Sequence, residues 1–510
     1  MQPEAGETAA PSRREWTPLL IAYLVLSALY AIYSLQRHGR FETGGLDLGL
    51  FDQAVWRWSR FLSPENTIRR VPTLLADHFS PVMMLLVPVR WLGFDERGLL
   101  VVQPFIACAG AFPIFSFARR RLPRTDALLV AGAFLISWGL LQGLGFEIHE
   151  VAFTALFLPL AVDAFDRKAV WSFWIFLALW LLTKEDQGFA IAGLGLVAMA
   201  QRRWPLAAGL GAIGIGWVLL ATRVLIPHFA GGTYNYWLYG YLGATPSAVL
   251  LYCLTHPVVF AKSVFTPLVK TKTLLQLLGG YAFAPLFSPY ALLLVLPTLE
   301  HLLTDWPPSW SGRFQYWMPI SAAAALAAAD GWARLRRRSE ASGRPALLGH
   351  RRSALVLLAA SLVASVVAAV PQRGLLKPSN WSEPGIGREG REILALIPPD
   401  ASVSATQQAL GHLGARRSVY LLRYGWWHGR AYPPIRARYV VVDPILFAAG
   451  GKREDVHPFN DPEYRLLRRV GDWSLFRLRD DLPDARGFYP VPPGLKTLGA
   501  EMIFDQRANY

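Results

Sequence analysis

The chain has 510 residues, of which 53% are hydrophobic and only 17% are charged. Charged residues make up about 25% of an ordinary soluble domain, so the composition excludes that class and favours a membrane protein. The net charge of +15 does not indicate a nucleic-acid partner, because the excess arginines stand in short clusters between apolar runs, as in cytoplasmic loops.

Uncharged runs predict the membrane helices in chain order. Four runs of about 20 residues are long enough to cross a hydrocarbon core of roughly 30 Å: 17–36, 98–118, 127–146 and 353–372. The first run is long for the apolar part of a secretory signal and has no cleavage pattern near it, so we expect it to remain as a helix.

Basic clusters prefer the cytoplasmic side of a membrane, which gives six anchors: 12–14, 119–124, 166–168, 201–203, 334–338 and 350–352. Placing all six inside predicts about eleven transmembrane helices, near 17–36, 98–118, 127–146, 151–165, 169–183, 188–200, 205–222, 273–287, 288–304, 315–332 and 353–371. Residues 1–16 are then a cytoplasmic N-terminus, residues 17–372 form the transmembrane domain, and the C-terminus lies outside.

Two parts of the transmembrane domain are predicted to lie outside the membrane. In the external loop 37–97, residues 48–61 have apolar side chains at helical spacing and predict an amphipathic helix on the membrane surface. Residues 79–92 would make only about 21 Å of helix, which suits a re-entrant or interfacial segment. The external segment 227–272 is rich in Tyr, Trp and Pro, as expected in the headgroup region.

The three runs between 151 and 200 are shorter than a comfortable span, so their ends are expected in protein or in a water-filled cavity. Joining 169–200 into one helix through "KEDQG" would make it roughly 48 Å long, and a turn is the better interpretation. From 373 to 510 no spanning run remains. "REILALIPPDASVSA" predicts a helix and a strand, and "RRSVYLL", "ARYVVVDP" and "DWSLFRLRDD" predict further strands, so this is an extracytoplasmic α/β domain.

This topology places nearly every acid and histidine of the membrane part outside, or at helix ends just beneath. Ionisable residues at membrane depth are costly and usually functional, which favours a polar site open to the external side; the alternative is a set of solvated loop carboxylates. The residues are Asp47, Asp52, Asp77, His78, Glu147, His149, Glu150, Lys184, Glu185, Asp186, His228, Glu300, His301 and Asp305.

Such a set suits transfer chemistry. One carboxylate can act as general base on an acceptor hydroxyl, while cations or a carboxylate-bound metal neutralise a departing phosphate. A divalent ion such as Mg²⁺ or Mn²⁺ could bind at Asp47, Asp77, His78 or His149. The chain has no HExxH, P-loop, GxGxxG or GxSxG motif, and its two cysteines indicate no disulfide framework or cysteine metal site, so the energy must come from an activated substrate or a gradient.

The order of the pieces resembles the GT-C class of integral-membrane glycosyltransferases, which use polyprenyl-phosphate-linked sugars. The segments "DLGLFDQAVW", "DHFSPVMMLLVP", "FEIHEVAF", "KEDQG", "RFQYWMPI" and "IPPDASVSA…ARYVVVD" are more closely similar to an uncharacterised bacterial membrane family, a GT-C-like family of unknown function. The similarity runs from about Asp47 to Asp443. It implies a multi-pass protein of the bacterial inner membrane.

The resemblance also implies roles for residues. Asp47 matches the acid that is commonly the catalytic base, and Asp52 could share that role or bind a metal. The acids and histidines of the external clusters would bind substrate, and the lipid phosphate would lie near basic helix ends, for which the candidates are Lys184, Arg223, Lys270, Lys272 and Arg313.

The leading hypothesis is therefore transfer of a sugar from a polyprenyl-phosphate donor to an external glycan, lipid or protein acceptor. A transporter or lipid-glycan flippase is the second hypothesis, in which buried acids and "KED" carry protons or cations; no inverted repeat supports it. A non-catalytic envelope scaffold is the third.

Overall fold

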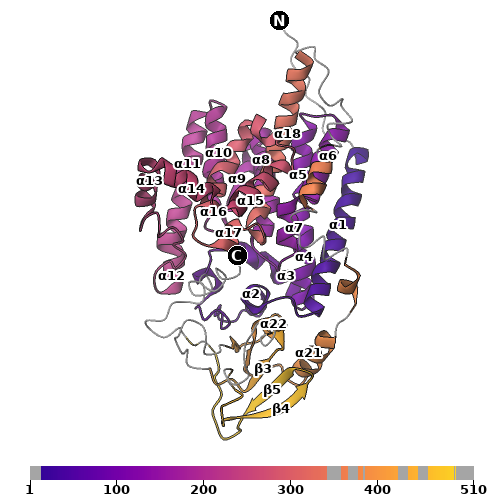
Figure 1. The fold of residues 1–510 in the computed structure, drawn as a ribbon, viewed down its shortest axis with the longest axis vertical. Helices are drawn as coiled ribbons and strands as arrows, with labels where there is room; N and C mark the ends of the chain where they lie inside the picture. Colours follow the sequence, from indigo (N-terminus) through magenta and orange to yellow (C-terminus); the bar gives the residue numbers. More distant parts are fainter. Residues whose placement is uncertain are drawn as a thin grey trace.

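The computed structural model describes residues 13–341, 356, 358–365, 377–382, 385–422, 435–445, 456, 458–487 and 489. A large helical part lies at one end of the molecule and a small β-sheet part at the other, with the short helix α2 (Leu50–Ser59) between them (Figure 1). One hydrophobic core runs through both parts, since Val403, Val419 and Trp473 of the sheet part belong to the same buried cluster as the helices.

Four helical stretches are long and apolar enough to cross a membrane, and each matches a predicted span. They are Arg14–Gly39 in α1 (Arg13–Gly39), Glu96–Arg119 in α4 (Glu96–Cys108) and α5 (Ala111–Arg119), Arg124–Leu144 in α6 (Arg124–Leu135) and α7 (Trp138–Leu144), and Trp204–Ala230 in α11 (Trp204–Leu220), η4 (Ala221–Leu225) and α12 (Ile226–Ala230). The count of eleven stays a prediction. Residues 358–365 of the predicted helix 353–371 are helical, and most of the others lie outside the described residues.

The other helices of this part are shorter or more polar: α8 (Val151–Asp166), α9 (Val170–Leu181), α10 (Gln187–Ala200), α15 (Leu268–Gly279), α16 (Leu292–Leu302), α17 (Pro307–Trp310) and α18 (Met318–Ala341), with 3-10 turns η5 (Ala284–Phe287), η6 (Pro289–Ala291) and η7 (Gln315–Trp317). α9 and α10 are separate, so the chain turns at "KEDQG" as predicted. α10 packs closely on α11 because a Cβ on Gly188 would lie 2.1 Å from the Gly214 carbonyl oxygen, which leaves room only for glycine.

Two helices lie within the segment predicted as an aromatic external stretch. α13 (Pro246–Thr255) and α14 (Pro257–Phe265) are apolar and bent by 106° relative to each other, as in a broken span or a re-entrant loop. α14 packs against α15 and α16. Sequence inspection missed the pair because Pro257 divides the run into two helices of about ten residues, each too short for a span.

Residues 37–97, which were predicted as an external loop, contain the predicted helices, but in a different setting. After a π-helical turn, η1 (Gly45–Gly49), α2 is buried on nearly all sides, and Gln53 and Arg57 donate to the carbonyl oxygens of Arg416 and Arg417, each at 3.1 Å. Thus the sheet part covers α2, which was expected on the membrane surface. η2 (Leu74–Ala76), η3 (Pro81–Leu86) and α3 (Val87–Trp91) follow, and the last two form the predicted short apolar segment.

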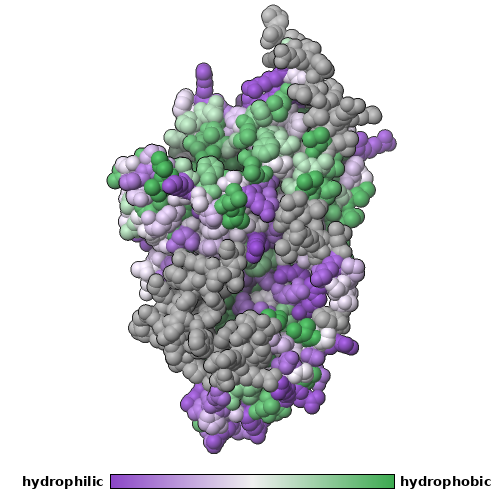
Figure 2. All heavy atoms as spheres, in the orientation of Figure 1, coloured by the Kyte–Doolittle hydropathy of each residue, from purple (hydrophilic) through white to green (hydrophobic). Residues whose placement is uncertain are grey.

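The C-terminal part is a mixed five-stranded sheet of order β2-β1-β3-β5-β4. β1 (Val403–Ala405) pairs in parallel with β2 (Val419–Leu421) and β3 (Tyr439–Val442), and the antiparallel hairpin of β4 (Tyr464–Val470) and β5 (Trp473–Leu478) completes it. η8 (Pro378–Trp381), α21 (Gly385–Ala395) and α22 (Gln407–Leu410) accompany the sheet. The predicted α/β character is confirmed. Apolar side chains gather over the helical part, whereas hydrophilic ones are prominent at the sheet end (Figure 2).

Candidate functional site

Several loops at helix ends bring the predicted acids together. Asp47 lies on the turn η1, Glu147, His149 and Glu150 lie between α7 and α8, and Lys184 lies between α9 and α10. These loops meet beneath the sheet part because α22 packs on η1, and a Cβ on Gly45 would lie only 2.3 Å from the Leu410 side chain. The position of Asp47 is therefore set by both parts of the molecule.

Asp47 and His149 form the first half of the site. The Asp47 side chain is 30% exposed, and its Oδ1 lies 3.2 Å from His149 Nε2. His149 Nδ1 lies 3.0 Å from the Glu147 carbonyl oxygen. Both partners of the ring can only accept, so both ring nitrogens donate and the geometry selects the imidazolium. Burial opposes that charge, but the hydrogen bond to Asp47 and the charges of Asp47 and Glu150 together raise the pKa of His149.

Glu147 is the buried neighbour of this pair. Its Oε1 accepts a hydrogen bond of 3.0 Å from the Gly44 backbone N–H, while its Oε2 is buried without a partner. Burial, and next the charge of Asp47, raise the pKa of Glu147 to about 7, against the opposing charges of Arg37 and His149. A carboxyl that changes charge near neutral pH therefore lies directly behind Asp47.

Lys184 is the centre of the second half. Its buried Nζ lies 3.1 Å from Glu150 and 3.9 Å from Asp186, and 5.8 Å from the centre of the Tyr316 ring. Glu150 follows His149 in the chain and pairs with Lys184, so these two neighbouring residues connect the two halves.

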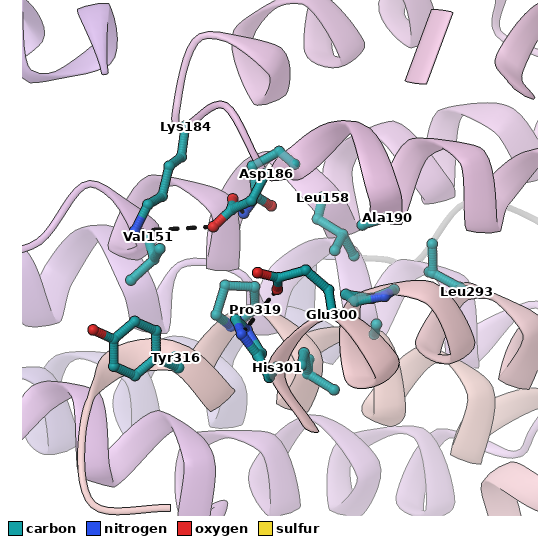
Figure 3. A pocket seen from close by; sticks show the side chains of 14 residues that line it. Val151, Leu158, Lys184, Asp186, Ala190, Leu293, Glu300, His301, Tyr316 and Pro319 are labelled. Carbon is teal, nitrogen blue, oxygen red and sulfur yellow. Dashed lines mark hydrogen bonds and ion pairs between the residues drawn. The ribbon is translucent and has the colours of Figure 1, made fainter. Parts of the chain in front are cut away.

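Lys184, Asp186 and Tyr316 line a pocket (Figure 3). Glu300 and His301 of α16 line it from the opposite side and pair with each other at 2.9 Å. Burial raises the pKa of Asp186 to about 6, opposed by Lys184 and supported by Glu300. The rest of the lining is mostly apolar: Val151, Leu158, Gln187, Ala190, Leu293, Pro297, Pro319, Ile320 and Ala323. The pocket thus offers an apolar wall with charged groups at one side, as an amphipathic substrate requires.

Asp77 and His78 hold the loop 37–97 against this site. Asp77 Oδ1 pairs with Arg69 Nε at 3.0 Å and accepts from the Tyr236 hydroxyl. His78 Nδ1 lies 2.6 Å from Glu185 Oε1, and its ring stacks on Tyr236 at 4.5 Å. Burial works against the charge of Asp77, but Arg69 and His78 outweigh it and lower the pKa of Asp77. Sequence analysis missed Tyr236 and Tyr316; the tyrosines recurring in 234–241 and the segment "RFQYWMPI" were the available signals.

Comparison with known proteins decides the family. The family model described as "Predicted membrane protein (DUF2079)" matches residues 37–481, which is most of the chain. The chain belongs to the DUF2079 family. The resemblance found in the sequence is therefore confirmed, and no curated protein matches the chain.

Two solved structures share the overall fold of this DUF2079 protein. ArnT from Cupriavidus metallidurans bound to undecaprenyl phosphate aligns over 93% of this chain and 100% of its own, with a TM-score of 0.51 and 14% identity. ArnT from the same organism in the apo state aligns over 90% and 98%, with a TM-score of 0.50 and 13% identity. The helical GT-C fold with a small C-terminal sheet is confirmed at this level.

The remaining predicted residues of the DUF2079 protein lie apart from the pocket. Asp52 is fully buried and forms an ion pair with Arg90, so no substrate reaches it in this structure. Lys270 is buried and donates to the carbonyl oxygens of Ser263 and Leu302, at 2.7 and 2.5 Å. The others are exposed: Arg223, His228, Lys272 and Arg313. Of the five predicted phosphate-binding cations, Lys184 alone lies among the clustered acids.

The four predicted metal ligands form two separate pairs. Asp47 contacts His149, whereas Asp77 and His78 bind other partners, and in the described part of the chain the four do not form a group of three ligand atoms. A Mg²⁺ or Mn²⁺ ion at either pair stays a prediction.

Proposed function

We propose that this DUF2079 protein is a GT-C-like glycosyltransferase that moves a sugar from a polyprenyl-phosphate-linked donor to an acceptor outside the cytoplasm. The observation that carries the proposal is Asp47: a partly exposed carboxylate, held by a buried imidazolium, which is followed in the chain by Glu150, the partner of a buried lysine that lines the pocket. The fold of ArnT, solved with undecaprenyl phosphate bound, supports the same class of lipid.

Each part of the site has a role in this reaction. Asp47 takes the proton from the acceptor hydroxyl as the acceptor oxygen bonds to the anomeric carbon of the sugar. The bond between that carbon and the phosphate oxygen breaks, and the lipid phosphate leaves with the electron pair. His149 orients Asp47, and Lys184 stabilises the negative charge on the phosphate. The apolar wall of the pocket receives the first isoprene units.

A comparison of wild type, Asp47→Asn and Glu42→Gln tests this function. Glu42 is the matched control because it is an exposed carboxylate five residues before Asp47. Undecaprenyl phosphate added to each purified protein should bind all three, as measured by native mass spectrometry. Lipids that co-purify from cells should include a polyprenyl-phosphate sugar, and more of it with Asp47→Asn, because turnover is blocked by about 10² to 10⁴-fold.

Bulk phospholipid alone on all three proteins, with no binding of added undecaprenyl phosphate, would contradict the transferase. Full transfer activity in Asp47→Asn would contradict the role of the base while leaving the lipid class intact.

The proposal includes the orientation of the chain in a bacterial inner membrane, with about eleven crossings, the N-terminus cytoplasmic and the sheet part extracytoplasmic. Support comes from the predicted cytoplasmic clusters, which meet at one place: Arg120 pairs with Asp163 at 2.7 Å, and Arg121 pairs with Asp166 and, at 3.3 Å, with Asp330. These helix ends lie opposite the sheet part (Figure 1).

Reporter fusions test the orientation. A reporter after Lys168 or Arg338 should be cytoplasmic, and one after Lys377 should be extracytoplasmic. An external signal after Lys168 would contradict this orientation and the placement of the site outside.

A further inference from the structure

A second cluster of titratable side chains lies outside the candidate site, where the helical part meets the sheet part. His38 is at the end of α1, Glu96 begins α4, and His412 follows α22. Each offers one ligand atom, and these three atoms lie within 4.8 Å of one another. Among the described residues, these three side chains form a group that could hold a metal ion.

The cluster contains a buried polar atom without a partner. His38 is 4% exposed in its side chain, and its Nδ1 lies 2.8 Å from the Thr43 hydroxyl, which fixes the ring and leaves Nε2 facing Glu96 at 3.4 Å. Nε2 of His412 is buried and has no hydrogen-bond partner. Buried polar atoms usually have partners, so an unsatisfied ring nitrogen beside a second imidazole and a carboxylate indicates a missing ligand.

The surroundings hold His412 in place. Its ring stacks on that of His38 at 3.8 Å and contacts Phe41 at 3.9 Å. Gly411 lets the backbone come close, since a Cβ there would lie 3.0 Å from the Thr43 hydroxyl.

Two arginines also lie near His412, and both have partners of their own. Arg97 pairs with Asp95 at 3.4 Å, and Arg391 donates to the Gly39 carbonyl oxygen at 3.3 Å. Asp95 balances the charge of Arg97, whereas the partner of Arg391 is an uncharged carbonyl oxygen. Glu96 is the carboxylate beside the two imidazoles.

We propose that His38, Glu96 and His412 bind a divalent transition-metal ion, with Zn²⁺ the best match, and that the ion clips the sheet part to α1 and α4. Two imidazoles and one carboxylate are a usual Zn²⁺ set, with water in the fourth position. Ligand atoms about 2.1 Å from a tetrahedral ion lie roughly 3.4 Å apart. Binding therefore requires the ligand atoms, which lie within 4.8 Å of one another, to move closer and the two stacked rings to rotate until both lone pairs point at the ion. The hydrogen bond from His38 to Thr43 supplies the outer contact that such ligands need.

Zinc binding by the full-length protein in detergent tests the proposal. Wild type, Glu96→Gln, His412→Gln and the control His256→Gln are stripped with a chelator and titrated with Zn²⁺ alone. His256 is exposed, in the bend between α13 and α14. Wild type and control should bind one Zn²⁺ per chain, and both ligand variants should bind it at least tenfold more weakly. Zn²⁺ should raise the unfolding temperature of wild type and control but not of the ligand variants.

Absence of stoichiometric Zn²⁺ binding in wild type would overturn the proposal, and so would wild-type binding in both ligand variants. If His412→Gln fails to fold, Glu96→Gln still tests the zinc site, because the amide nearly preserves the volume of the carboxylate and this variant is expected to fold. Lipid binding at the Asp47 site is measured independently, so either proposal can fail alone.

Discussion

Asp47 and Asp52 are five residues apart on one segment, yet the structure gives them opposite surroundings. The Asp47 side chain is 30% exposed and contacts His149, whereas Asp52 is 0% exposed and pairs with Arg90. Five residues correspond to about 140° around an ideal α-helix, so the two side chains leave the segment in different directions. Asp47 faces the loops of α8 and α10, and Asp52 faces the sheet part, where a Cβ on Gly414 would lie 2.7 Å from its Oδ2.

The comparison teaches that pairing and exposure separate a reactive acid from a structural one. A carboxylate that must take a proton from a substrate has to be reachable and oriented, as Asp47 is. A fully buried carboxylate with one cation is retained because each charge neutralises the other, and removal of either leaves the other uncompensated.

Replacing each acid by its amide tests whether Asp47 is the reactive acid and Asp52 the structural one. Asp52→Asn should cost up to about 3–5 kcal/mol in the free energy of unfolding, because the Arg90 side chain loses its ion-pair partner in a buried place and keeps only the charges of Glu96 and Asp95 nearby. Asp47→Asn should cost no more than about 1 kcal/mol, since its pair is partly exposed. Thermal unfolding in detergent measures both effects. Transfer per folded molecule should show the reverse order, with the large loss in Asp47→Asn.

The double variant Asp52→Leu with Arg90→Met is the control for this prediction. It removes both charges and should recover most of the stability lost in Asp52→Asn. Equal losses of stability in the two amide variants, or loss of transfer in folded Asp52→Asn, would contradict the division of roles.

The sequence predicted the helices better than it predicted these partners. Twenty uncharged residues specify a long helix locally, which is why the span at 17–36 corresponds to α1. The pairing of Asp52 with Arg90, or of His38 with His412, depends on how distant segments pack, and no local pattern reports it. Sorting the acids by membrane side did predict that Asp47, His149 and Lys184 gather, because loops on one side of a helical bundle share limited space.

The sheet part was predicted as a separate external domain, and that description missed its most important contacts. The side-chain hydroxyl of Thr67, in the loop 37–97, donates to the Val419 carbonyl oxygen at 2.6 Å and accepts from the Val419 N–H at 3.1 Å. The loop therefore contacts the edge of the sheet at β2 through this side chain. Alternating apolar residues predicted the strands. Thr67 and Val419 are 352 positions apart in the sequence, and no local pattern around the threonine indicates that they form hydrogen bonds.

Glu147 is a third carboxyl group of this region, buried like Asp52 but without a cation bound to it. We expect it to make a smaller contribution to the free energy of unfolding, and one that depends on pH. Its pKa rises from 4.5 to about 7 in the folded protein, so the folded state holds this proton more tightly than the unfolded chain. The stability from this group is fully present below pH 4.5 and is lost as pH rises through 7, a change of about 3 kcal/mol.

Glu147→Gln should remove that dependence, because the amide resembles the protonated carboxyl and can still accept from the Gly44 N–H. The unfolding temperature of the variant in detergent should therefore fall less than that of wild type between pH 5 and pH 8, and Glu42→Gln should follow wild type. Parallel curves for Glu147→Gln and wild type would show that Glu147 is already ionised at pH 5. It would then be a second ionised carboxylate beside the His149 imidazolium, but a buried one, so Asp47 would remain the carboxylate that an acceptor hydroxyl can reach.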